Sequence, residues 1–209
     1  MLNKVKLSGI VASKPKFEEK FGGEKIYGFV LKSKKPNKDE YYEINIRISD
    51  RFDCFSKVEE GVFIELTGSI RSVNKRVEGC TNKERRLIVS VFCNTVKVLD
   101  DDSEFVNTAE IICYIHSEPF FMEASDTMPQ RCDMLMMIKR SNKKVSYLPI
   151  TFRGRNAEFV SHMEVGQMLK CEGRLQTRDY TKTRNGVTKN YRVTEFVVRT
   201  VEPLDSPDE

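Results

Sequence analysis

The sequence predicts an all-β protein made of two copies of one small domain. Short runs of alternating Val, Ile and Phe recur with turn signals between them, the pattern of a small sandwich or barrel. Two glycines, Gly61 and Gly68, reappear 105 positions later as Gly166 and Gly173. A repeat of this length can bury its own core, which indicates a duplicated domain and not a solenoid unit.

The repeat covers most of the chain in three aligned pairs of segments. These pairs are 5–15 with 109–119, 58–72 with 163–177, and 88–100 with 193–205. The run Asp100-Asp-Asp-Ser-Glu104 lies between two strand-rich halves and is typical of a solvated linker. The predicted organisation is therefore a first domain at 1–100, an acidic linker at 101–104, a second domain at 105–205 and a short acidic tail at 206–209.

Turn signals divide each copy into strands. Gly22-Gly23 marks the first hairpin, and residues 34–39 form a second loop rich in Lys, Pro, Asn and Asp. In the second copy, Asn185-Gly186 lies between strands rich in Arg and Tyr. Because Asn and Gly tolerate the positive φ angles of a type I′ turn, this pair predicts a long hairpin.

One short helix is expected to interrupt the strands of each copy. In the second copy Asn156 can cap it, Phe159, Val160 and Met163 form its apolar face, and Gly166 ends it. In the first copy the equivalent stretch is 50–61, with Phe52, Phe55 and Val58 as the buried face. The order of elements predicts two tandem OB-fold five-stranded barrels, each with one short helix between the third and fourth strands.

Charge is sorted along the chain. The formal net charge is only +4, too small to identify a partner by itself. From Lys170 to Arg192, however, seven basic residues occur with two acidic ones, and from Glu202 to Glu209 four acids occur with no base. The basic stretch coincides with the predicted hairpin around Asn185-Gly186, which indicates a surface for an anionic polymer.

The chemistry of an enzyme is not indicated. The six cysteines form no C-x-x-C pair, so neither a zinc site nor any other metal site is expected. The two histidines, His116 and His162, have no Cys or carboxylate at ligand spacing, and no Gly-rich phosphate loop occurs. We expect no catalytic residue and no cofactor. The absence of a signal peptide and of a long apolar run predicts a cytoplasmic protein with reduced thiols and no membrane partner.

Several segments together resemble a known family. They include the stretch from Pro149 to Gly166, the sequence Glu172-Gly-Arg-Leu-Gln-Thr-Arg-Asp-Tyr180, the turn at 185–186, and the opening segments Asn3-Lys-Val-Lys-Leu-Ser-Gly9 and Phe21-Gly-Gly23. In this combination the chain resembles bacterial single-stranded DNA-binding proteins and their primosomal relatives. The family commonly places Trp at its stacking positions, whereas this chain contains no Trp.

The resemblance implies a set of nucleic-acid-binding residues. The family's aromatic positions match Tyr147, Arg153 and Tyr180, and the corresponding positions of the first copy are Tyr42 and Lys75. Tyr rings and the Arg guanidinium can stack on bases, and basic side chains meet phosphates. The phosphate-binding candidates are Arg174, Arg178, Lys182, Arg184, Lys189 and Arg192 in the second copy and Arg71, Lys75, Arg76 and Arg85 in the first.

The expected function is sequence-independent binding and protection of single-stranded DNA in replication, recombination or repair. Since family members assemble four OB folds, two copies per chain imply a homodimer. One alternative is a primosomal, conjugation or plasmid replication accessory, whose OB folds serve mainly in protein–protein interaction and bind nucleic acid weakly, with replication proteins as candidate partners. The sequence also leaves RNA open as a ligand, because stacking does not distinguish ribose from deoxyribose.

Overall fold

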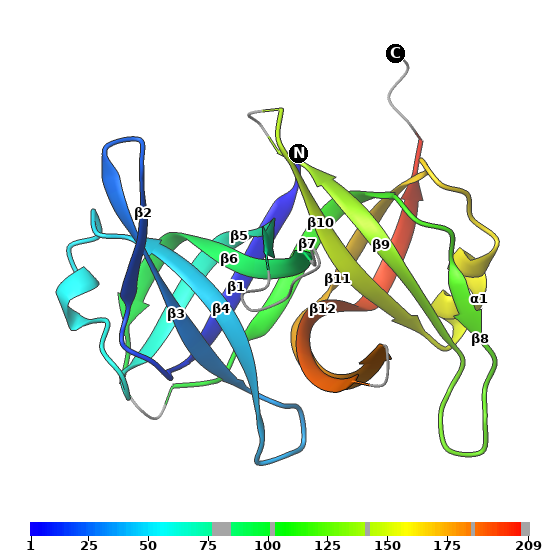
Figure 1. Ribbon diagram of the computed structural model, residues 1–209, viewed down its shortest axis with the longest axis horizontal. Helices are drawn as coiled ribbons and strands as arrows, with labels where there is room; N and C mark the ends of the chain where they lie inside the picture. Colours follow the sequence, from blue (N-terminus) through cyan, green and yellow to red (C-terminus); the bar gives the residue numbers. More distant parts are fainter. Residues whose placement is uncertain (77–84, 101–102, 141–142, 185–186, 206–209) are drawn as a thin grey trace. The chain divides into compact units, whose positions relative to one another are not determined.

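A computed structural model describes residues 1–76, 85–100, 103–140, 143–184 and 187–205. The chain is almost entirely β, with twelve strands and two short helical segments in the described residues (Figure 1). The elements in order are β1 (Asn3–Val11), β2 (Lys16–Phe21), β3 (Glu24–Lys34), β4 (Tyr41–Ser49), η1 (Phe55–Lys57), β5 (Phe63–Arg76), β6 (Arg85–Val98), β7 (Asn107–Ile115), β8 (Phe120–Met122), β9 (Arg131–Lys139), β10 (Val145–Arg153), α1 (Arg155–Ser161), β11 (Met168–Arg184) and β12 (Val187–Leu204). The predicted all-β class is confirmed.

The chain forms two compact units that are not its contiguous halves. The N-terminal unit comprises residues 4–71 and 90–108, and the C-terminal unit comprises 1–3, 72–89 and 109–209. Thus the distal half of the β5–β6 hairpin, which belongs to the first copy by sequence, groups with the second copy. Within the described part of the chain, no helix has the length and apolar character needed to cross a lipid bilayer.

The two units repeat one pattern of strand pairing. In the N-terminal unit, β1 pairs with β3 and β5, β3 with β4, and β6 with both β4 and β5. In the C-terminal unit, β7, β9, β10, β11 and β12 pair in the same way. The parallel pairs also correspond, because Ile46 lies beside Val91 and Ile150 lies beside Phe196.

Alternating side chains build the core of each unit. Along β4 and along β9, every second residue is buried, as expected for strands with one face toward a core. Leu31, Ile44 and Phe63 are fully buried in the N-terminal unit, and Phe152 and Phe196 in the C-terminal unit. Burial of such side chains is the main favourable contribution to folding.

The cysteines are mostly core residues, as their apolar sequence neighbours indicate. Cys93, Cys113, Cys132 and Cys171 are buried, Cys54 is half-buried, and Cys80 lies outside the described residues. Burial raises the pKa of the Cys132 thiol to about 11 and that of Cys93 to about 12. These two thiols therefore stay protonated at neutral pH and pack as small apolar groups.

The first hairpin forms at the predicted glycines. β2 ends at Phe21 and β3 begins at Glu24, with Gly22 and Gly23 between them at φ angles of 59° and 87°. Positive φ at both central residues is the requirement of a type I′ turn, which explains the two glycines. The second predicted turn, Asn185-Gly186, lies outside the described residues.

The helix predicted in the first copy is much shorter in the structure than expected. Between 50 and 61 only the single 3₁₀ turn at Phe55–Lys57 forms, and it buries none of its own residues. Val58 is buried as predicted, but Phe52 and Phe55 are half-exposed. The segment Asp-Arg-Phe-Asp-Cys-Phe-Ser lacks strong helix formers, and its Asp and Ser residues favour turns over short helices.

The predicted helix of the second copy exists, but it ends at Ser161, before Met163 and Gly166. It spans Arg155–Ser161 and buries Ala157 and Val160, whereas Phe159 is 45% exposed. The predicted cap, Asn156, lies inside the helix and donates a hydrogen bond to the Arg199 carbonyl oxygen at 2.9 Å. Gly154 occupies the N-cap with a φ of 56°, a conformation suited to glycine. Because β8 adds a strand, the helix follows the fourth strand of its copy.

Candidate nucleic-acid interface

Strand β10 presents the predicted Tyr147 and Arg153 on its outer side. Both positions alternate with buried residues, so they lie on the face of the strand that points away from the core. Tyr147 is half-buried, and its ring lies 4.7 Å from the His116 ring, centroid to centroid. Its backbone N–H donates to the Ser72 hydroxyl oxygen at 2.7 Å. Arg153 is exposed at the end of the strand.

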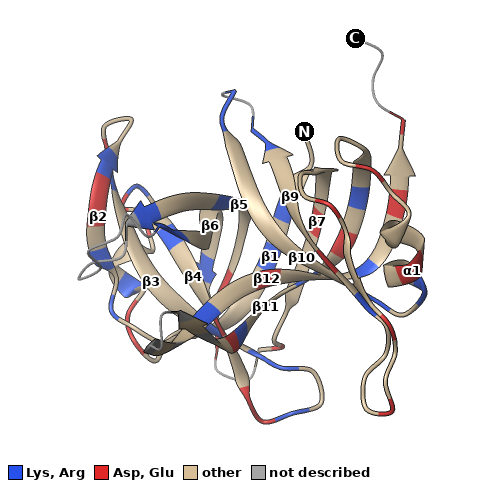
Figure 2. Cartoon of the chain, turned by 45° about the vertical axis from the view of Figure 1, so that its right-hand side comes forward, with Lys and Arg blue, Asp and Glu red and all other residues tan. Residues whose placement is uncertain are grey.

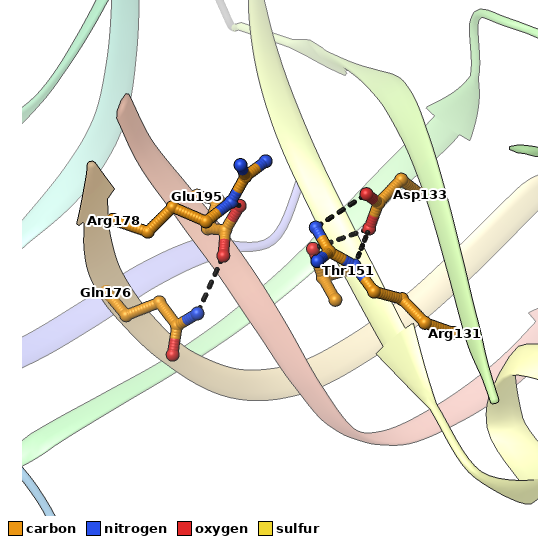
Figure 3. Close-up of polar contacts among 6 residues, drawn as sticks. All are labelled: Arg131, Asp133, Thr151, Gln176, Arg178 and Glu195. Atoms are coloured by element: carbon orange, nitrogen blue, oxygen red, sulfur yellow. Dashed lines mark hydrogen bonds and ion pairs between the residues drawn. The ribbon is translucent and has the colours of Figure 1, made fainter. Parts of the chain in front are cut away.

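A polar cluster joins β9 to β10 between these two positions (Figure 3). Arg131 binds the Asp133 carboxylate through two nitrogens, with N···O distances of 2.7 and 2.6 Å. The Thr151 hydroxyl donates to the same carboxylate at 2.8 Å. Arg131 and Thr151 thus both donate to the Asp133 carboxylate. This carboxylate keeps only a limited capacity to accept further hydrogen bonds.

A second polar cluster lies across β11 and β12. Glu195 is 2% exposed, and its carboxylate accepts hydrogen bonds from Gln176 Nε2 at 2.6 Å and from Arg178 Nε at 2.9 Å. A buried carboxylate needs such partners, because desolvation of an unpaired charge is costly. Figure 3 shows the terminal nitrogens of Arg178 pointing away from that carboxylate. Glu195 therefore fixes Arg178 while leaving the end of its guanidinium group exposed.

Two tyrosines stack on the β11–β12 hairpin. Tyr180 and Tyr191 face each other across the strands with ring centroids 5.4 Å apart and an interplanar angle of 22°. Arg178 lies 5.7 Å from the Tyr180 ring, and Arg86 lies 5.8 Å from the Tyr191 ring. Tyr180 is 40% exposed. Aromatic rings flanked by guanidinium groups can hold bases by stacking and phosphates by charge.

Arg86 reaches this hairpin from strand β6. Its guanidinium group donates a hydrogen bond to the Arg192 carbonyl oxygen. The Arg192 side chain is paired with Asp179, with N···O distances of 2.8 and 3.1 Å. Basic positions outnumber acidic ones along the hairpin (Figure 2). Arg192 and Arg178 are each paired with a carboxylate, so Arg86, which binds a neutral carbonyl oxygen, contributes more of the positive charge beside the rings.

A small surface pocket lies beside these clusters in the C-terminal unit. Its volume is about 250 Å³. Its lining combines residues from β8 to β12 and from the segment before β8: Ser117, Glu118, Phe120, Asp133, Met134, Leu135, Pro149, Ile150, Thr151, Arg178 and Glu195. The pocket is thus next to the Thr151 position of β10, between the two positions predicted to stack.

Only some of the predicted residues of the second copy lie close together. Arg178, Tyr180 and Arg192 lie together on the hairpin, whereas Tyr147 and Arg153 lie on β10. Arg174 is half-buried, and its Nε is buried without a hydrogen-bond partner among the described residues. Lys182, Arg184 and Lys189 lie on the same two strands by backbone position, but their side chains fall outside the described residues.

Tyr42 does not match Tyr147, and this part of the prediction is wrong. The parallel pairs place β4 and β10 in correspondence at a spacing of 104, so Tyr42 corresponds to Ser146 and Tyr147 to Glu43. Tyr42 is 8% exposed and Ser146 is fully buried. A shift of one residue moves a side chain to the opposite face of a strand, which explains why Tyr42 is unavailable for stacking on a base.

The other candidates of the first copy lie on the β5–β6 hairpin. The Arg71 guanidinium lies over the Phe92 ring at 3.4 Å from its centroid, a cation–π contact that occupies one of its faces. Lys75 and Arg85 are exposed. The side chain of Arg76 falls outside the described residues. Lys75 and Arg85 thus offer exposed positive charge, but these positions contribute no aromatic ring.

Three residues near the predicted positions were not predicted: Tyr191, His116 and Phe120. The first could have been found, because a two-residue turn at 185–186 places residue 191 opposite residue 180. Nothing in the local sequence indicates that Arg86 reaches Tyr191 or that His116 contacts Tyr147. Both contacts join segments distant in sequence and depend on the tertiary fold.

Comparison with solved structures identifies the fold. The chain superposes on a deletion variant of the single-stranded DNA-binding protein from Thermus aquaticus with a TM-score of 0.76 and 16% identity, covering 100% of this chain and 97% of that one. This chain has the fold of that protein. The wild-type Thermus aquaticus protein gives a TM-score of 0.72 at 16% identity, with 100% and 95% coverage. No family model matches the sequence, and no curated protein matches it.

Shorter structures match about half of the chain. The N-terminal domain of a PriB protein from Thermoanaerobacter tencongensis is 26% identical and covers 47% of this chain and 98% of its own, with a TM-score of 0.39. The two Thermus aquaticus structures, which cover 100% of this chain, confirm the predicted resemblance at the level of fold.

Proposed function

We propose that this chain binds single-stranded DNA without sequence preference, and that each of its two copies is an OB-fold barrel. The observation that carries the proposal is the pair of stacked tyrosines on the β11–β12 hairpin, flanked by Arg86 and Arg178. Rings of this kind accept any base, because every base has a π-face. Support also comes from the fold, which is that of a single-stranded DNA-binding protein over the whole chain.

The proposal assigns different roles to the two copies. The second copy supplies Tyr147, Arg153 and the hairpin rings, while the first supplies Lys75, Arg85 and Arg86 as charged positions. Protection of single strands during replication, recombination or repair is the role that such binding would serve. We also propose a homodimer, giving four OB folds, which sedimentation at micromolar concentration would test.

The direct test is competition among three ligands. We expect fluorescence anisotropy with labelled oligo(dT) to show tight binding at low salt, and unlabelled duplex DNA to compete poorly. The affinity should fall linearly with salt on logarithmic axes, because basic residues release counterions from the phosphates. An absence of binding to oligo(dT) at low salt would refute the proposal, and equal competition by oligo(U) would extend it to RNA.

Arg86 provides a sharper test of the hairpin site. Replacing Arg86 by Ala removes the cation beside Tyr191 and should lower the affinity for oligo(dT) by about fivefold at low salt. The slope of log affinity against log salt should become shallower by about one counterion. Arg51→Ala is the matched control, since Arg51 also lies over a ring, that of Phe52, but in the N-terminal unit. An equal loss in both variants would assign the effect to net charge alone.

A further inference from the structure

The pocket beside Thr151 is lined mostly by residues that have no part in the proposed stacking of bases on the tyrosine pair. We propose that it holds one base of the bound strand, stacked on Phe120, while the Arg178 guanidinium donates hydrogen bonds to an acceptor of that base. This inference rests on the proposed function, because it places a part of the same ligand. It goes further in assigning the pocket a neutral, planar heterocycle and in giving Glu195 and Gln176 a positioning role.

The size of the pocket suits a single base. Its volume of about 250 Å³ is smaller than the sites that bury drug-sized ligands, which begin near ~300 Å³. The walls are apolar at Leu135 and Pro149 and polar at Thr151 and Arg178. A flat heterocycle with polar edges is complementary to such a lining, whereas a long aliphatic ligand would leave the polar groups unpaired.

The charge of the pocket argues against a phosphate. Its lining includes three carboxylates, those of Glu118, Asp133 and Glu195, and one guanidinium group, that of Arg178. Arg131 pairs with Asp133 from outside the lining, so acids still exceed bases. A phosphate would be repelled at this position, while a neutral base would not. The backbone of the strand is therefore expected along the basic hairpin, with the base turned inward.

The Arg178 side chain is already fixed in the absence of a ligand. Its Nε is bound to Glu195, and Glu195 is fixed in turn by Gln176. The guanidinium group carries five N–H donors, and the salt bridge uses the inner one. The side chain remains 41% exposed and lines the pocket. A preorganised donor binds with a smaller loss of side-chain entropy than a free arginine.

Phe120 supplies the stacking surface. It lies on β8 at the edge of the pocket and is 64% exposed, so its ring is accessible to a ligand. The pocket and the tyrosine pair are contiguous, because Arg178 lines the pocket and also lies 5.7 Å from the Tyr180 ring. One strand can thus place successive bases on the tyrosines and in the pocket.

The test separates contacts to bases from contacts to the backbone. Affinities of the wild type and of Phe120→Ala are measured for oligo(dT) and for an oligomer of equal length made of abasic residues. We expect Phe120→Ala to lower the affinity for oligo(dT) about fivefold or more and to leave the abasic affinity within twofold. Phe159→Ala is the matched control, since Phe159 is an exposed phenylalanine of the same unit outside the pocket lining.

The outcomes distinguish the pocket from the proposed function. Equal losses on both oligomers, or no loss on either, would overturn the pocket, while a wild type that binds neither oligomer would overturn the function itself. Phe120→Leu keeps apolar volume without a ring and should show the same selective loss, which guards against misfolding of the alanine variant. Glu195→Gln should change the ratio of affinities for oligo(dT), oligo(dC) and oligo(dA), whereas an unchanged ratio would remove Glu195 from the site.

Discussion

Simultaneous replacement of Tyr180 and Tyr191 by alanine is expected to lower the affinity for oligo(dT) by at least about thirtyfold. Stacking on a protein ring stabilises a bound base by about 1–3 kcal/mol, and the double variant removes both rings of the stacked pair. The loss should persist at high salt, because stacking does not release counterions. Anisotropy titrations at two salt concentrations would measure both affinities and the salt slope.

The matched control keeps the rings and removes only the hydroxyls. The double variant Tyr180→Phe and Tyr191→Phe should bind oligo(dT) within about twofold of the wild type, since the π-faces are retained. Circular dichroism of both double variants would verify that the hairpin still folds. A comparable loss in the phenylalanine variant would indicate hydrogen bonding by the hydroxyls and would contradict stacking as the main contribution.

Replacing Gly173 by alanine should destabilise the C-terminal unit by about 3 kcal/mol. A Cβ at this position would lie 2.1 Å from the Val197 carbonyl oxygen, and backbone cannot move aside as a flexible side chain can. Gly173 sits beside the irregularity in the register of β11 and β12. Chemical denaturation followed by circular dichroism would measure the free energy of unfolding.

The control for this variant is Gly166→Ala. Gly166 has a φ of 96° but nothing within 4 Å of an added Cβ, so alanine there suffers only the conformational cost of about 1 kcal/mol. Equal destabilisation by the two substitutions would show that backbone conformation, and not close approach, accounts for Gly173. A larger effect at Gly173 would confirm the contact.

The duplicated glycine illustrates what sequence reasoning predicts well. Gly68 and Gly173 were aligned from spacing alone, and a Cβ on either would strike the carbonyl oxygen of an equivalent residue, Phe92 or Val197. Strand periodicity and turn glycines are local signals, so they predicted most strands and the Gly22-Gly23 turn. Such features follow from steric rules that operate within a few residues.

Errors arose where the answer depended on register or on distant contacts. Tyr42 shares its strand face with Ile44, Ile46 and Ile48, all fully buried, so its alternation already indicated a core position. The spacing of 105 obscured this, because strands β4 and β10 correspond at 104. The prediction of a helix at 50–61 was wrong for a different reason, since a short helix with weak helix formers is stable only when tertiary packing supports it.

The assignment of residues 72–89 to the C-terminal unit has a consequence for any dissection of this protein. The Ser72 hydroxyl accepts a hydrogen bond from the backbone N–H of Tyr147, and Arg86 binds the Arg192 carbonyl oxygen, so both segments complete a surface encoded 75 and 106 positions away. A fragment that begins at 105 would carry most of the rings but lack these partners. The two copies thus cannot be separated by a single cut, and a faithful fragment must include the β5–β6 hairpin.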